Sequence, residues 1–191
     1  MAVPEFVLAF CAIVIGLGVS DLLSSLHRLF RAAPRVKWDW LALSFAGLML
    51  FLSVSFWWGT FAWYRGAASV SIADFLPTFF YLCVNFLMMA AALPDDVPDQ
   101  GLDLRKFYLS SRVHRWALLS VSIVTSIALE IAHNWPVHIL PFMTGMWPVF
   151  ISAAFAIACL RSPRIWIHIL AITWIGSAII YGNLLVGLAN S

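Results

Sequence analysis

The stretch "IGLGVSDLLSSLHRLFR" (residues 15–31) starts as an apolar helix and ends in basic residues, the pattern of a helix leaving a membrane on its inner side. Its apolar part reaches back to about residue 4, and a helix needs about 20 apolar residues to cross the hydrocarbon layer. The whole chain has the same character: 63% of its residues are hydrophobic, 10% are charged, and the mean hydropathy is +0.94. These values exclude an ordinary soluble domain and predict a polytopic membrane protein.

Six apolar stretches are long enough to span the membrane: about 4–30, 38–63, 72–93, 113–134, 137–160 and 164–189. Little sequence lies outside them, so we expect a single all-α domain over residues 1–191. The first stretch does not have the pattern of a secretory signal, because its basic residues follow the apolar run. Each cysteine lies inside an apolar stretch, which favours core filling over disulfides or a metal site: Cys11, Cys83 and Cys159.

The basic residues predict the orientation. Ten of the eleven Lys and Arg residues lie in the loops after the first, third and fifth stretches, and only Arg65 lies on the other side. Basic loops stay on the inner side, so both termini are expected outside. The longest of these loops, 94–112, contains Leu104, Phe107 and Tyr108 at helical spacing after an acidic turn. It is either a short helix on the inner membrane surface or a solvated linker.

Two pairs of segments suggest an internal repeat. The segments "PRVKWDWLALSFAG" (34–47) and "PRIWIHILAITWIG" (163–176) align without gaps, and "DFLP" (74–77) resembles "HILP" (138–141). These similarities favour three tandem helical hairpins over an inverted repeat. The alternative is convergence, because inner helix starts favour Arg and Trp.

Asp21 is the first polar residue that needs an explanation. It lies about 9 Å inside the inner boundary at 1.5 Å per residue, on one helix face with Gly18, Ser25 and Arg28. A charge at the bilayer centre costs about 2.5–3.5 kcal/mol, so this face is expected against protein or water. Asp21 is therefore either a structural anchor, with an inner arginine as the expected partner, or a protonatable or ion-coordinating group. Small residues on the adjacent face predict a helix-packing ridge: Gly16, Ser20 and Ser24.

Glu130 is the second such residue, and His133 lies one helical turn after it. Glu-x-x-His spacing places both side chains on one face, as in carboxylate-bridged metal sites, and His138 follows across a short turn. Three interpretations stay open: a bound metal, a hydrogen-bonded pair, or part of a proton or ion path. Other polar residues either extend such a path or form interhelical hydrogen bonds: Asn85, Tyr181 and Asn183.

Other patterns have structural interpretations. Asp39 falls in the first turn of the second stretch, and Ser71-x-x-Asp74 resembles a capping box. The outer half of the fifth stretch is expected to be kinked or locally broken by three residues: Pro141, Gly145 and Pro148.

The segments "VKWDW" (36–40) and "FWW" (56–58), together with the first stretch, resemble a group of small, uncharacterised bacterial six-helix membrane proteins. The similarity covers the first two stretches, then the "LP" at 93–94 and the acidic loop that follows. It implies a bacterial inner membrane, and it implies no activity, cofactor or catalytic residue.

Three functions remain open at this point. The first is a small oligomeric channel or transporter for protons or another small ion, with Asp21 and Glu130 on its path. The second is a non-catalytic subunit or scaffold that binds other membrane subunits or further copies of itself. The third is a haem or metal redox protein, in which histidines near each face would be axial ligands: His27, His114 and His168 inside, His133 and His138 outside.

Soluble-enzyme motifs such as a phosphate loop, a nucleophile elbow or a zincin helix are not found in the sequence, so an enzyme is the less favoured interpretation. The net charge is only +2 and the topology explains the basic residues, so nucleic acid is not an expected partner.

Overall fold

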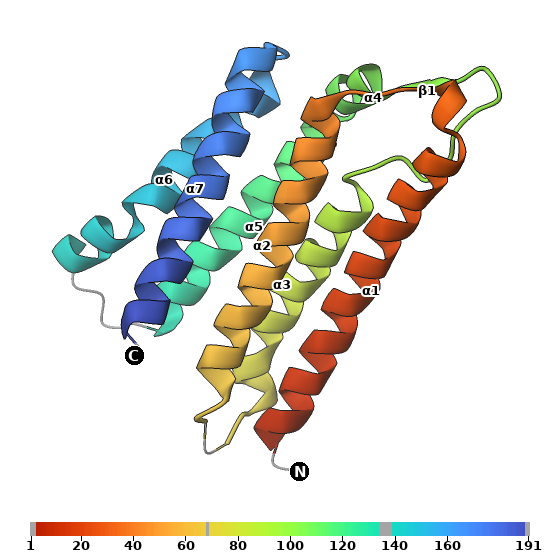
Figure 1. The fold of residues 1–191 in the computed structure, drawn as a ribbon. Coiled ribbons are helices and arrows are strands. Elements are labelled where there is room, and N and C mark those ends of the chain that lie inside the picture. Colours follow the sequence, from red (N-terminus) through yellow and green to blue (C-terminus); the bar gives the residue numbers. More distant parts are fainter. Residues whose placement is uncertain (1–2, 68, 134–138, 190–191) are drawn as a thin grey trace.

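The computed structural model describes residues 3–67, 69–133 and 139–189, and six long helices dominate it (Figure 1). Their bounds are α1 Val3–Arg31, α2 Trp40–Tyr64, α3 Ile72–Ala90, α5 Arg112–His133, α6 Ile139–Arg161 and α7 Ile165–Ala189. All six are long and apolar enough to cross a membrane, which confirms the all-α polytopic fold. The largest difference from the predicted stretches is in α3, which ends at Ala90 rather than at about 93.

The long helices form a closed ring. Around the ring the neighbours follow the order α1, α3, α5, α6, α7, α2, and α2 returns to α1. α2 and α3 also contact each other across the ring. The three predicted hairpin pairs are therefore neighbours: α1 with α2, α3 with α5, and α6 with α7. The internal repeat itself stays a prediction. We name the two ends of the ring by their contents: the α4 end carries the short helix α4 (Leu104–Ser110), and the distal end is where α1 begins (Figure 1).

Two loops are joined at the α4 end. The segment after α1 contains the 3-10 turn η1 (Ala33–Arg35) and the strand β1 (Val36–Lys37), which pairs in parallel with β2 (Leu102–Asp103) from the loop after α3. Four ion pairs cross between the same segments: Arg28–Asp95 at 3.5 Å, Arg35–Asp99 at 3.0 Å, Lys37–Asp103 at 3.2 Å and Arg105–Asp39 at 2.7 Å. Three of these pairs join acidic residues after α3 to basic residues at or after the end of α1.

Part of the loop 94–112 forms a helix, α4. The Asp103 side chain caps α4 by accepting the Lys106 backbone N–H at 3.0 Å. That hydrogen bond, with the Lys37 side chain nearby, holds the pKa of Asp103 below its ordinary value. Leu104 and Tyr108 are buried against the bundle, with α2 and α5 as neighbours. The apolar face of α4 therefore packs on protein.

The predicted helix caps are confirmed. The Asp39 carboxylate accepts the Leu41 backbone N–H at 3.0 Å, and Ser71 and Asp74 form a reciprocal capping box. The fifth stretch is predicted to be kinked or locally broken. The local break is wrong, because α6 is one continuous helix with Pro148 inside it, and the kink stays a prediction. The Pro148 carbonyl accepts the Ser152 hydroxyl at 2.7 Å. The side chain of Pro141 lies outside the described residues.

Gly101 is required by the turn before β2. Its φ is +89°, and a Cβ at this position would lie 2.9 Å from the Arg35 carbonyl oxygen. We expect Gly101→Ala to lower the free energy of unfolding by about 1–2 kcal/mol, because left-handed backbone strain and the steric contact add. Thermal unfolding in detergent measures the change. Gly66→Ala is the matched control, since a Cβ there meets open space; equal midpoints for the two variants would contradict the prediction.

Candidate functional site

Aromatic side chains fill the ring toward the α4 end. Trp116, Tyr108 and His168 are each 0% exposed, and Phe45 packs against the first two. The Trp116 indole N–H donates to the Tyr108 hydroxyl at 3.2 Å, and that hydroxyl lies 3.0 Å from His168 Nδ1. His168 Nε2 lies 2.9 Å from the Ser162 carbonyl oxygen.

The chemistry of the acceptor fixes the direction of this network. A carbonyl oxygen only accepts, so His168 Nε2 carries the proton and Nδ1 accepts from Tyr108. Burial raises the pKa of the Tyr108 hydroxyl, which keeps the proton that it donates. Donors and acceptors are therefore matched along this network, from Trp116 to Ser162.

Arg115 connects the ends of two helices. It is 1% exposed, and its guanidinium donates to the Ala91 carbonyl at 2.8 Å, just beyond α3. It also donates at the end of α4, to the carbonyls of Tyr108 and Phe107 and to the Ser111 hydroxyl. The guanidinium carbon lies 4.5 Å from the centroid of the Phe107 ring. Carbonyls at two helix C-termini thus stabilise this buried cation.

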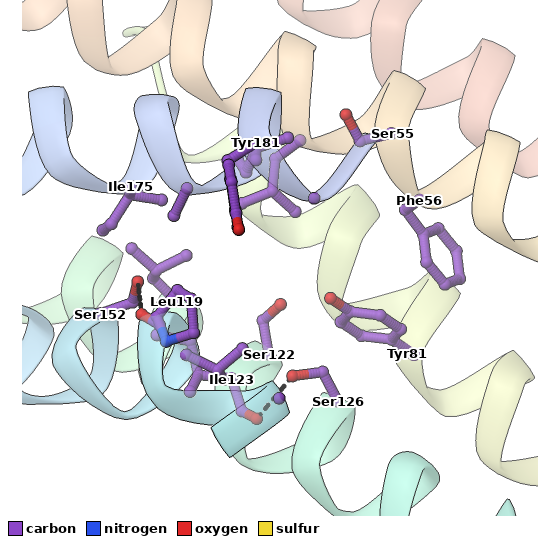
Figure 2. Close-up of a pocket in the computed structure, with 17 residues that line it drawn as sticks. Ser55, Phe56, Tyr81, Leu119, Ser122, Ile123, Ser126, Ser152, Ile175 and Tyr181 are labelled. Carbon is purple, nitrogen blue, oxygen red and sulfur yellow. Dashed lines mark hydrogen bonds between the residues drawn. The ribbon is translucent and has the colours of Figure 1, made fainter. Parts of the chain in front are cut away.

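A cavity of about 380 Å³ lies in the distal part of the ring, between α2, α3, α5, α6 and α7 (Figure 2). Six hydroxyl side chains contribute to its lining: Ser55, Tyr81, Ser122, Ser126, Ser152 and Tyr181. None of its 17 lining residues is charged, so the cavity is polar only through neutral groups. Figure 2 shows the Tyr81 hydroxyl pointing toward Ser122 across the cavity.

A second cavity of about 220 Å³ continues toward the distal end, and its lining includes two carboxylates, Asp74 and Glu130. The two cavities share Phe56, Tyr81 and Ser126, so they adjoin. The Asp74 carboxylate is bonded to Ser71 in the helix cap. The smaller cavity, which contains carboxylates, therefore adjoins an uncharged cavity with six hydroxyl side chains in its lining.

Polar stripes on two helices line this route. On α5 the stripe repeats every four residues, at Ser122, Ser126 and Glu130. On α3 it comprises Asp74, Thr78 and Tyr81, and the same helix face continues to Asn85, which lines neither cavity. Glu130 and Asn85 were predicted from the sequence, and the serine, threonine and tyrosine hydroxyls of the two stripes were not. The i, i+4, i+8 spacing on α5 is the signal that could have identified that stripe.

Asn85 ends the α3 stripe, one turn from Tyr81 toward the α4 end. It is 0% exposed, and its Oδ1 lies 2.8 Å from the Ser53 hydroxyl, which also lies 2.8 Å from the Met49 carbonyl. The Ser53 hydroxyl has one proton, so it donates either to Asn85 Oδ1 or to the Met49 carbonyl. If the Asn85 amide is turned over, Nδ2 donates to the Ser53 hydroxyl, which then donates to the Met49 carbonyl. In either orientation, one buried amide atom has no partner among the described residues.

Asp21 and Glu130 are not brought together. Asp21 lies on α1, and α3 separates α1 from α5 in the ring. The predicted pairing of Asp21 with an arginine is not formed: Arg28 binds Ser25 at 2.8 Å and Asp95 at 3.5 Å, because Asp95 reaches it from the loop after α3. Asp21 itself is half-buried and has no hydrogen bond or ion pair within the described ranges.

The remaining predicted residues have different positions. Tyr181 lines the larger cavity, and the Asn183 amide donates to the Ser55 hydroxyl at 2.9 Å, an interhelical hydrogen bond between α7 and α2. The predicted ridge is exposed on α1 and packs on no other helix of the described chain: Gly16, Ser20 and Ser24. The close helix approach is instead at Gly18, which packs on Met89 of α3.

The metal and haem predictions fall partly outside the described residues, which omit His138 and the side chain of His133. His27 and His114 are exposed. Both ring nitrogens of His168 are engaged by Tyr108 and Ser162, so this histidine would have to break its network to bind haem.

The six apolar helices define a polytopic α-helical membrane protein, with a partly open cavity between five of them. Comparisons of the chain with protein-family models, with curated proteins and with solved structures find no match.

Proposed function

We propose that the protein is a small membrane transporter that carries protons, the smallest of the candidate ions, through the ring of a single chain. The observation that supports this proposal is the pair of adjoining cavities inside the ring, with an acidic entrance at the distal end. The filled α4 end favours a gated carrier over an open pore, because a pore needs a continuous path.

The chemistry of the larger cavity favours protons. A metal cation that enters an uncharged cavity loses hydration without gaining a counter-charge, which is costly. Hydroxyl groups and water both donate and accept, so they can relay a proton by exchanging hydrogen bonds. Glu130 supplies a titratable group where the route meets the distal end.

The location is part of the same proposal. Basic residues gather at the α4 end, which supports a cytoplasmic position for that end and an outer position for the acidic entrance. The resemblance described above supports a bacterial inner membrane. The cavities lie within one chain, so transport does not require an oligomer.

Glu130→Gln is expected to lower proton flux by about tenfold or more, because it removes the titratable group and the field that concentrates cations at the entrance. The measurement is dye-reported pH change in proteoliposomes under an imposed pH gradient. Glu5→Gln is a matched control at the distal end of α1, and Asp21→Asn tests the residue that lines neither cavity. Both controls are expected to match the unmodified protein.

Two outcomes would contradict the proposal. Unchanged proton flux in Glu130→Gln would show that the carboxylate at the entrance takes no part in transport. Absence of flux in the unmodified protein under both gradient directions would favour the alternative that the chain is a subunit of a larger complex.

A further inference from the structure

A pocket of about 250 Å³ lies beside the α4 end of α1, outside the ring. It is lined by three guanidinium side chains, Arg28, Arg31 and Arg35, and by the Asp96 carboxylate, with Ala32 and Val97 completing it. Neither of the ring cavities includes any of these residues. The pocket is therefore independent of the proposed transport route.

The charges in this pocket are only partly neutralised. Arg35 is bound to Asp99, and Arg28 uses one terminal nitrogen for Ser25 and Asp95. Arg28 Nε is buried and has no hydrogen-bond acceptor among the described residues. Within the same ranges Arg31 and Asp96 form no ion pair. One pocket thus offers free cationic donors together with a free carboxylate.

A shallow groove on the exposed face of α1, lined by this one helix, leads to the same arginine. It measures about 560 Å³ and is lined by Gly16, Val19, Ser20, Leu23, Ser24, His27 and Arg28. From its first to its last residue it covers about 18 Å at 1.5 Å per residue. Half of the hydrocarbon layer is about 15 Å thick. The groove therefore has the length of one acyl chain and ends at the charged pocket.

We propose that this pocket and groove bind one phospholipid with a phosphoethanolamine headgroup. The acyl chain lies over the small residues, the phosphate accepts from Arg31 and Arg28, and the primary ammonium donates to Asp96. A guanidinium and a phosphate form strong, charge-assisted hydrogen bonds. Exposed Phe30 and Trp38, whose ring centroids are 5.2 Å apart, lie in the same part of the chain, and aromatic rings are typical of this interface.

Charge complementarity selects this headgroup over the common alternatives. An anionic glycerol headgroup would satisfy the arginines but leave Asp96 without a cation. A choline headgroup has the cation but no N–H to donate to the carboxylate. Phosphoethanolamine supplies both an acceptor for the arginines and a donor for Asp96.

The test is native mass spectrometry of the purified chain exchanged into equal amounts of ethanolamine, glycerol and choline phospholipids with identical acyl chains. We expect the ethanolamine lipid to be retained about tenfold over the other two. Arg31→Gln should lower its retention about tenfold, and Asp96→Asn should abolish the preference over the glycerol lipid. Ser20→Leu, which fills the groove, should lower retention of all three lipids.

Matched controls come from α7 and from the residue before it. Arg164→Gln and Ser177→Leu change the same residue types at exposed positions outside the pocket and groove, and both should retain lipid normally. Equal retention of the three lipids, or displacement of the lipid by millimolar inorganic phosphate, would overturn the assignment. A Ser20→Leu variant that changes from dimer to monomer with lipid retention intact would place a second copy of the chain in the groove instead. Retention is measured on the folded chain, so its outcome does not depend on transport.

Discussion

Arg115→Leu is expected to lower the free energy of unfolding by about 3–5 kcal/mol, the largest stability effect that the structure predicts for one side chain. The substitution removes a guanidinium that is 1% exposed and joins the end of α3 to the end of α4. It leaves carbonyls near two helix C-termini without these donors, one of them, that of Tyr108, in a buried hydrogen bond. The stacking of the cation on the Phe107 ring is lost as well.

Arg115→Lys distinguishes the contribution of the positive charge from that of the planar guanidinium shape. An ammonium keeps the charge but lacks the planar fork that reaches Ala91 and Tyr108 at once, so most of the stability loss should remain. Unfolding in mixed detergent and dodecyl sulfate, followed by tryptophan fluorescence, measures both variants. Arg164→Leu is the control, because Arg164 is exposed and surface substitutions change stability by about 0.5 kcal/mol or less. Similar unfolding curves for Arg115→Leu and Arg164→Leu would show that the connection contributes nothing.

The fold could be predicted where local physics decides it. Apolar runs long enough to cross a bilayer identify all six long helices, since length and composition alone determine that property. Caps are equally local: Asp39 and the pair Ser71 and Asp74 have their partners within three residues along the chain. Arg115 shows the limit of such reasoning. In the sequence it is one more basic residue of an inner loop, yet in the structure it is fully buried among carbonyls.

The candidate site depends on the order of helices in the ring, which the sequence pattern does not contain. Glu130 and Asp21 have similar signatures, an isolated acid in an apolar stretch. Only the ring order shows that Glu130 lines a cavity while Asp21 lies on α1, away from both. The sequence predicts that the ridge of small residues on α1 faces another helix, but the ridge is exposed. Gly18 on the neighbouring face is equally small and is the residue that packs, so residue size alone could not show which face does.

Ser126→Trp is expected to reduce proton flux to the background of empty vesicles, a loss of at least about tenfold. Ser126 lines both cavities, so an indole at this position would fill their junction and separate Glu130 from the larger, hydroxyl-lined cavity. The cavities provide room for the larger side chain, which limits the steric cost to the fold. Proteoliposome flux and the unfolding midpoint are measured on the same preparation.

Val124→Trp is the matched control for this obstruction. Val124 lies on the same helix two residues away, is 65% exposed, and lines neither cavity of the route, so the added indole should face lipid and leave flux unchanged. If both variants lose flux, the cause is added side-chain volume on α5 in general and not obstruction where the two cavities meet. Normal flux in a stably folded Ser126→Trp protein would contradict the proposed route, because Ser126 is one of the three residues that both cavities share. The Ser126 result therefore tests the path, and the Glu130→Gln result tests the chemistry at its entrance.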